Sequence, residues 1–91
     1  MNVAYVRVST VEQNEERQVQ ALEAYQIEKW FKEKVSAKDT NRPQRQAMLG
    51  YVREGDKVCV HDFSRLARST ADLLAIVELL KRKDVLAMLM T

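Results

Sequence analysis

The chain has 91 residues, of which 46% are hydrophobic and 31% charged, and its formal net charge is +2. This length allows one domain, which buries only about 60–65% of the surface that the unfolded chain exposes. The small charge does not by itself indicate nucleic-acid binding, and two Gly and one Pro exclude a flexible linker or a low-complexity tract.

Cysteine usage and hydropathy indicate an intracellular protein. The single cysteine, Cys59, cannot form an internal disulfide and lies between two valines, where a small buried hydrophobe is typical. The N-terminal residues lack the charged-then-apolar order of a signal peptide, and no apolar run approaches the length of a membrane span. We therefore expect a cytoplasmic location and no membrane partner.

The first half of the chain alternates between strand-like and helix-like patterns. An apolar run from Val3 to Val8, interrupted only by Arg7, predicts a buried strand. Apolar residues then recur at helical spacing and predict an amphipathic helix that reaches about residue 25; they are Val19, Leu22 and Tyr25. A shorter and more polar strand is expected at 29–35, and residues 36–41 have the composition of a loop.

The second half repeats this alternation. Asn41-Arg42-Pro43 predicts a helix start, and the helix should end at Glu54-Gly55-Asp56. Its buried face is expected to hold Met48, Tyr51 and Val52. A third strand is expected from Lys57 to Phe63 and a fourth from Val85 to Met90. Between them, a capping box at Ser69–Asp72 precedes a helical pattern of apolar residues at Leu73, Ile76, Val77 and Leu80.

The resulting order β-α-β-α-β-α-β predicts an α/β domain with a parallel sheet and helices on both faces. In such sheets functional groups gather at the carboxyl ends of the strands. Ser9, the loop 36–42 and the segment 62–68 should therefore lie along one edge.

Four arginines fall at this edge: Arg7, Arg42, Arg65 and Arg68. Arg65 and Arg68 are spaced i, i+3, so one helical turn could aim both side chains the same way. Convergent guanidinium groups repel one another unless an anion lies between them, and their forked donors suit phosphate oxygens. A helix N-terminus nearby would add N–H donors and a favourable dipole.

Each of these residues also has a structural explanation. Arg7 could pair with Asp62, and Arg65 with Arg68 could form a solvated helix start. Ser9 could be a helix cap, but Thr10-x-x-Gln13 is as good a capping box as Ser9-x-x-Glu12. If Thr10 caps the helix, the hydroxyl of Ser9 is left at the strand end, two residues after Arg7 and on the same strand face. A hydroxyl beside arginines and a helix N-terminus can attack phosphorus.

Metal and nucleotide-loop chemistry have little support. The chain has one His and one Cys, with no cluster at metal-ligand spacing, and His61 reads as structural. No Gly-rich phosphate loop is present.

Taken together, the motifs resemble the serine recombinases, the resolvase/invertase family of site-specific DNA recombinases. The resemblance runs along nearly the whole chain, and its most specific parts are the first and last motifs. The matching segments are Tyr5-x-Arg7-x-Ser9-Thr10, Gln13, Gln18, Ser36-Ala37, Arg42-Pro43, Gly55-Asp56, Arg65-Leu66-Ala67-Arg68-Ser69 and Asp72-Leu73.

The resemblance implies a three-layer, resolvase-like α/β domain with a mainly parallel sheet. It also implies that Ser9 attacks a DNA phosphodiester and forms a 5′-phosphoserine link. Arg7, Arg65 and Arg68 match the arginines that grip the scissile phosphate in the family. Arg42, Gln18 and, less closely, Gln13 match supporting positions. The implied partners are double-stranded DNA and further copies of the protein, as a dimer and a synaptic tetramer, with no metal or other cofactor.

Some positions depart from the family pattern. Many resolvases have Asp where this chain has Ser64, and Asp62, placed by strand alternation on the same face, is a hypothetical substitute. Ala37, Ala67 and Lys83-Asp84 stand where Gly is common. The general base for Ser9 stays open.

Family members continue into another strand and a long helix, so residues 1–91 resemble a catalytic domain truncated at its C-terminal side. We expect weak DNA affinity and little recombination from these residues alone. A non-catalytic α/β module that binds phosphate or a partner surface, as a decayed recombinase or a regulatory domain, is the alternative.

Overall fold

The computed structural model describes residues 1–8, 16–35, 42–61 and 63–89. The helices and strands of these segments, in chain order, are β1 (Asn2–Val8), α1 (Glu16–Glu23), β2 (Lys29–Lys34), α2 (Pro43–Tyr51), β3 (Lys57–Val60), α3 (Phe63–Leu66), α4 (Thr70–Arg82) and β4 (Leu86–Leu89).

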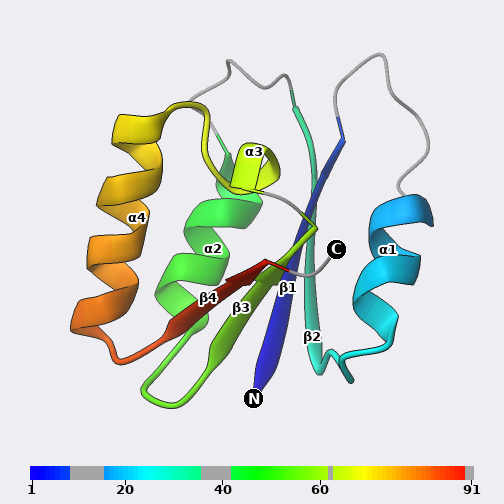
Figure 1. The fold of residues 1–91 in the computed structure, drawn as a ribbon, viewed down its shortest axis with the longest axis horizontal. Coiled ribbons are helices and arrows are strands. Elements are labelled where there is room, and N and C mark those ends of the chain that lie inside the picture. Colours follow the sequence, from blue (N-terminus) through cyan, green and yellow to red (C-terminus); the bar gives the residue numbers. More distant parts are fainter. Residues whose placement is uncertain (9–15, 36–41, 62, 90–91) are drawn as a thin grey trace.

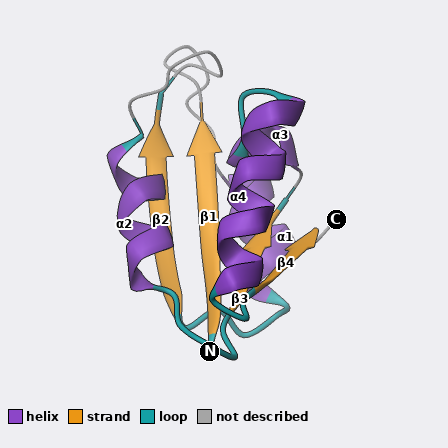
Figure 2. Cartoon of the chain, turned by 90° about the vertical axis from the view of Figure 1, so that its left-hand side faces the viewer, coloured by secondary structure: helices purple, strands orange, loops and turns teal. Residues whose placement is uncertain are grey.

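The strands form one sheet in the order β2-β1-β3-β4, and each neighbouring pair is parallel. Helices α2 and α4 lie over one face of this sheet and α1 over the other, which gives three layers (Figure 1). Figure 2 shows β1 and β2 pointing the same way, with their carboxyl ends at one end of the sheet. The predicted α/β class with a parallel sheet is confirmed.

The central strand β1 supplies the core on both faces, because successive side chains of a strand point to opposite sides. Val3 and Tyr5 belong to the larger cluster, with residues of α2 and α4. Ala4 and Val6 belong to the smaller one, with Leu22 of α1 and others. Arg7 therefore follows Val3 and Tyr5 on the face that α2 and α4 cover.

The expected strand from Lys57 to Phe63 was too long. β3 ends at Val60, and Phe63 begins the short helix α3, which buries Leu66 completely. Burial of Leu66 under the α2–α4 layer favours a turn of helix over further extension of the strand. Strand alternation therefore does not extend to Ser64, and the argument that related Asp62 to Ser64 by strand face was wrong.

Smaller differences occur at element ends and on helix faces. Helix α1 ends at Glu23, two residues before Tyr25, which is exposed, and Gln26 has a positive φ of 56°. In α2, Tyr51 was predicted to lie on the buried face but is 40% exposed, and its ring packs edge to face against Phe31. Val77 of α4 is likewise exposed, whereas its predicted neighbours Ile76 and Leu80 are buried.

Cys59 is buried as expected, and burial raises the pKa of its thiol. Within the described segments, no helix has the length and hydropathy needed to cross a membrane.

Candidate active site

Arg7 fastens the carboxyl end of β1 to two other segments. Its residue is only 4% exposed, although it is charged. One terminal nitrogen, Nη1, donates to the carbonyl of Val35 at 3.0 Å, just beyond β2. The other, Nη2, lies 3.5 Å from the carbonyl of Ser64 in α3. Arg7 therefore joins β1, the end of β2 and α3.

The side-chain amide of Gln18, on α1, forms hydrogen bonds with both the backbone N–H and the carbonyl of Arg7. Its Oε1 accepts the Arg7 N–H at 3.3 Å, and its Nε2 donates to the Arg7 carbonyl at 2.9 Å. Within the described residues, the pairing of β1 with β3 runs from Asn2 to Ala4 and ends before Arg7. The buried amide of Gln18 satisfies the backbone N–H and carbonyl of Arg7, as buried backbone groups require.

Arg42 is completely buried and holds the end of α3. Its Nη1 donates to the carbonyls of Arg65 and Leu66, at 3.4 and 3.1 Å. Carbonyls at a helix C-terminus lack helical partners and carry partial negative charge, so a guanidinium group suits them.

Arg42 immediately precedes α2, and the carboxyl group of Glu33, on β2, caps the N-terminus of that helix. The side chain of the N-cap residue, Arg42, does not cap this helix, and the N–H of Gln44 instead donates to Glu33 Oε2 at 2.5 Å. Tyr5 Oη lies 3.4 Å from Glu33 Oε1. Glu33 is only 5% exposed, and its two carboxyl oxygens lie against the start of α2 and the hydroxyl of Tyr5.

The hydroxyl of Tyr5 reports on these surrounding charges. Burial, together with the negative charge of Glu33, raises the pKa of Tyr5 far above its usual value. Arg42, Arg45 and Arg7 act in the opposite direction. All three guanidinium groups therefore lie close enough to this hydroxyl to lower its pKa.

Arg65 and Arg68 are more accessible. Arg65 is half-buried, and its Nη1 lies 3.4 Å from the carbonyl of Arg7. Arg68 is exposed and lies between α3 and α4, so the expectation that one helical turn aims both side chains was wrong. Its N–H donates to Asp72 Oδ2 at 3.1 Å.

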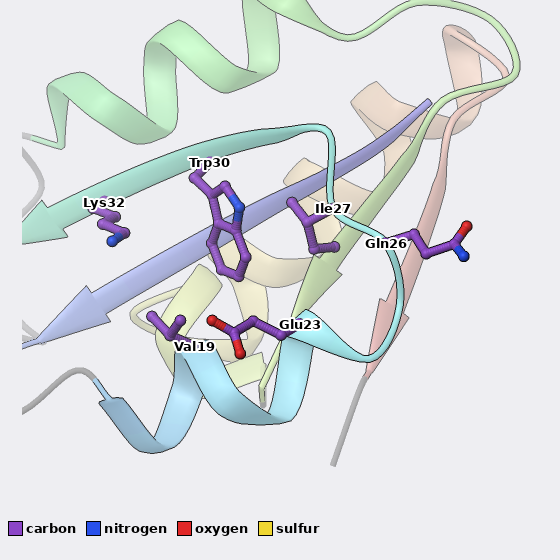
Figure 3. A pocket seen from close by; sticks show the side chains of 6 residues that line it. All are labelled: Val19, Glu23, Gln26, Ile27, Trp30 and Lys32. Atoms are coloured by element: carbon purple, nitrogen blue, oxygen red, sulfur yellow. The ribbon is translucent and has the colours of Figure 1, made fainter.

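A hollow of about 240 Å³ lies beside Arg68, where α3 meets α4. Ser69, which lines it, caps α4: its Oγ accepts the N–H of Asp72 at 3.1 Å, so the predicted capping box is confirmed on that side. Another hollow, of about 370 Å³, lies on the other face of the sheet, between α1 and β2 (Figure 3). It is lined by Val19, Trp30 and neighbours and by none of the four arginines.

The described residues that were predicted at this edge therefore lie close together. Contacts with backbone carbonyls link Arg7, Arg42, Arg65 and Gln18, and Arg68 lies three residues after Arg65 in the chain. Arg7, Arg42 and Arg65 each donate to backbone carbonyls of neighbouring segments. Ser9, Gln13 and Asp62 lie outside the described residues.

Two participants were missed from the sequence. Arg45 is buried and bonds the carbonyl of Leu66 and the carboxylate of Asp72. Its i, i+3 spacing from Arg42 could have indicated it. Glu33 lies two residues after the buried Phe31 and so on the same face of β2, and this period-2 pattern could have indicated a buried carboxylate. The described residues hold no cluster of three or more His, Cys, Asp or Glu side chains suited to a metal ion.

The comparison with protein families decides which family has this arrangement. The model of the family described as "Resolvase, N terminal domain" matches residues 2–90. The chain belongs to the resolvase N-terminal domain family. The suspected relation to the serine recombinases is thereby confirmed.

Curated resolvases and an invertase are among its relatives. The chain is 51% identical over 83 residues to the Transposon Tn501 resolvase of Pseudomonas aeruginosa and 37% identical over 75 residues to the DNA invertase Hin of Salmonella typhimurium. These alignments cover 91% and 82% of this chain, but 43% and 40% of the relatives. The chain thus spans less than half the length of these relatives.

The fold of this resolvase-family domain also matches a solved structure. The C-terminal catalytic domain of ISC1926 TnpA, an IS607-like serine recombinase, superposes with a TM-score of 0.81 and 24% identity. The superposition covers 97% of this chain and 68% of the other. At this identity the match supports the shared fold.

Proposed function

We propose that this domain is the catalytic core of a site-specific DNA recombinase and that Ser9 is its nucleophile. The serine oxygen attacks a DNA phosphodiester, the new bond to phosphorus forms a 5′-phosphoserine, and the broken P–O bond releases a 3′-hydroxyl. Strand exchange follows, and the reverse attack by a 3′-hydroxyl reseals the DNA. The observation that carries the proposal is the arginine cluster at the end of β1, because Ser9 follows Val8, the last residue of β1, in the sequence.

Burial divides the arginines between two roles. The exposed Arg68 and half-buried Arg65 are suited to bind the phosphate oxygens directly. Arg7 and Arg42 are buried against carbonyls, so they fix the backbone that carries the other two and add positive charge to the site. Gln18 supports the same backbone. Gln13 is proposed as a supporting residue from the family resemblance, and Asp62 as a substitute for the Asp that many resolvases have at the position of Ser64.

The proposed substrate is double-stranded DNA, and the proposed partners are further copies of the protein, first as a dimer and then as a synaptic tetramer. The names of the relatives, resolvase and invertase, support this assignment. The phosphoserine conserves the energy of the cleaved bond, so the mechanism requires no metal or other cofactor. A cytoplasmic location accords with a DNA substrate.

The nucleophile can be tested in a chimera in which this chain replaces the matched part of the Tn501 resolvase. The chimera is incubated with supercoiled DNA that carries the recombination site of the Tn501 resolvase. We expect a protein–DNA adduct that survives denaturation, and we expect Ser9→Ala to abolish it. An adduct formed by Ser9→Ala would show that another residue is the nucleophile.

The arginines are tested in the same chimera. Arg65→Ala and Arg68→Ala should each lower the rate of adduct formation by about 10²–10³-fold, as loss of a transition-state donor does. Arg82→Ala is the matched control, since Arg82 is exposed at the far end of α4. Circular dichroism should show the fold intact in all three, and an unchanged rate in Arg65→Ala or Arg68→Ala would remove that residue from the phosphate site.

The alternative function, a module that binds phosphate or a partner without catalysis, makes a different prediction. If the unmodified Tn501 resolvase forms the adduct on this DNA and the native chimera forms none, the binding module is favoured.

A further inference from the structure

Arg45 lies on α2, one turn after Arg42, and its side chain is 7% exposed. A single nitrogen, Nη1, donates to two acceptors on other elements. One is the carbonyl of Leu66, at 3.0 Å, and the other is Asp72 Oδ2, at 2.8 Å. Arg45 therefore links α2 to the last residue of α3 and to the first turn of α4.

Asp72 receives more than this ion pair. The same oxygen, Oδ2, accepts the backbone N–H of Arg68 at 3.1 Å, while the N–H of Asp72 donates to Ser69 Oγ. Burial tends to raise the pKa of Asp72, but the N–H of Arg68 and the guanidinium of Arg45 outweigh it, so the pKa is lowered. The carboxylate thus stays charged at neutral pH and holds the peptide of Arg68.

The two acceptors of Arg45 lie on either side of Arg68 in the chain. Leu66 ends α3 two residues before Arg68, and Asp72 lies four residues after it. Arg42 Nη1 reaches the carbonyl of Leu66 as well, so α2 presents two guanidinium groups to the end of α3. The short connection between α3 and α4 is thereby held at both ends from one helix.

We propose that Arg45 is a positioning residue that acts through Arg68: together with Asp72 it holds the peptide of Arg68 so that this exposed guanidinium meets the DNA phosphate. The inference rests on the proposed function, in which Arg68 binds the scissile phosphate. Arg45 does not bind DNA itself, because it is buried and turned toward Leu66 and Asp72. An ion pair of this kind contributes little net stability, since desolvation offsets its attraction, and it is better suited to fixing geometry.

The link from Arg45 to Arg68 can be measured without catalysis, in the 91-residue chain. Amide hydrogen exchange followed by NMR should show the Arg68 N–H exchanging at least about tenfold faster in Arg45→Met than in the native chain. Arg45→Lys keeps the charge and should restore part of the protection. Arg82→Met removes the exposed Arg82–Glu78 pair and should leave the Arg68 N–H unchanged.

The catalytic consequence is measured in the chimera as the rate of adduct formation. Arg45→Met should slow it by about tenfold to a hundredfold, the range expected when a catalytic group is misplaced by about 1 Å. Arg45→Lys should recover part of the loss. In Arg68→Ala, adding Arg45→Met should cost less than about threefold more, because a residue that acts through Arg68 has nothing left to position.

The proposal would be overturned if Arg45→Met slowed adduct formation by the same factor in Arg68→Ala as in the native protein. It would also be overturned if the Arg68 N–H exchanged at the same rate in Arg45→Met as in the native chain. If Arg45→Met does not fold, the exchange rate of the Arg68 N–H and the rate of adduct formation are measured in Arg45→Lys instead, and the same criteria apply. If the native chimera forms no adduct, the proposed function has failed, and the exchange rates alone then decide whether Arg45 holds Arg68.

Discussion

Replacing Gln18 with Leu tests how the end of β1 is held. Leu has similar volume and favours helix, so α1 itself should be unaffected. The substitution removes both hydrogen bonds from the Gln18 amide to the backbone of Arg7. The Arg7 carbonyl keeps the contact with Arg65 Nη1 at 3.4 Å, whereas the Arg7 N–H loses its acceptor while it stays buried.

The energetic cost follows from that one N–H. A buried donor left without a partner costs about 1–3 kcal/mol, and the added apolar contact of Leu offsets only part of this. We therefore expect the free energy of unfolding to fall by about 2 kcal/mol, which is roughly a 30-fold change in the unfolding equilibrium. At about 1 kcal/mol per molar urea, the midpoint should fall by about 2 M.

The measurement is urea unfolding of the chain, followed by the fluorescence of Trp30. Gln20→Leu is the matched control, because Gln20 lies on the same helix, is exposed, and its Nε2 lies 3.5 Å from Oε1 of the exposed Glu16. Its stability should change by less than about 0.5 kcal/mol. If Gln18→Leu is as stable as Gln20→Leu, the amide of Gln18 does not support β1, and the account of this strand end is wrong.

Two further predictions concern the capping of α4 and the buried hydroxyl. Ser69→Ala removes the acceptor for the Asp72 N–H and should lower stability by about 1 kcal/mol in urea unfolding, with the exposed neighbour Thr70→Ala as the comparison. Tyr5 has a raised pKa in the folded chain, so above about pH 10 the unfolded chain loses this proton first and stability falls as pH rises. Tyr5→Phe should flatten that part of the pH profile, and a profile unchanged by Tyr5→Phe would contradict the burial argument.

The sequence predicts the strands and helices of this fold well, because apolar residues recur with a different period in a strand than in a helix. The run from Val3 to Val8 and the helical pattern around Ile76 and Leu80 are local signals, and the structure confirms both. The end of β3 is set differently. Val60 and Phe63 are both apolar, so local pattern cannot mark the change to α3, which depends on burial of Leu66 and on donors from α2.

Gln18 shows how far site prediction reached. The resemblance indicated that Gln18 belongs to the site. Its contact with the Arg7 peptide, however, depends on where the pairing of β1 with β3 ends, and tertiary packing sets that point. The roles of Ser9, Gln13 and Asp62 remain predictions, because these residues lie outside those that the structure describes.

The burial of the arginines changes the physical argument for a phosphate site. Arg7, Arg42 and Arg45 each donate to a backbone carbonyl, and Arg45 also pairs with the carboxylate of Asp72. These contacts are made within the protein, so they can fix the three side chains before DNA binds. A site whose donors and charges are ordered in advance loses little free energy to reorganisation in the transition state. The buried arginines thus serve the proposed reaction by holding Arg65 and Arg68, and with them the positive field, in a fixed position at the end of β1.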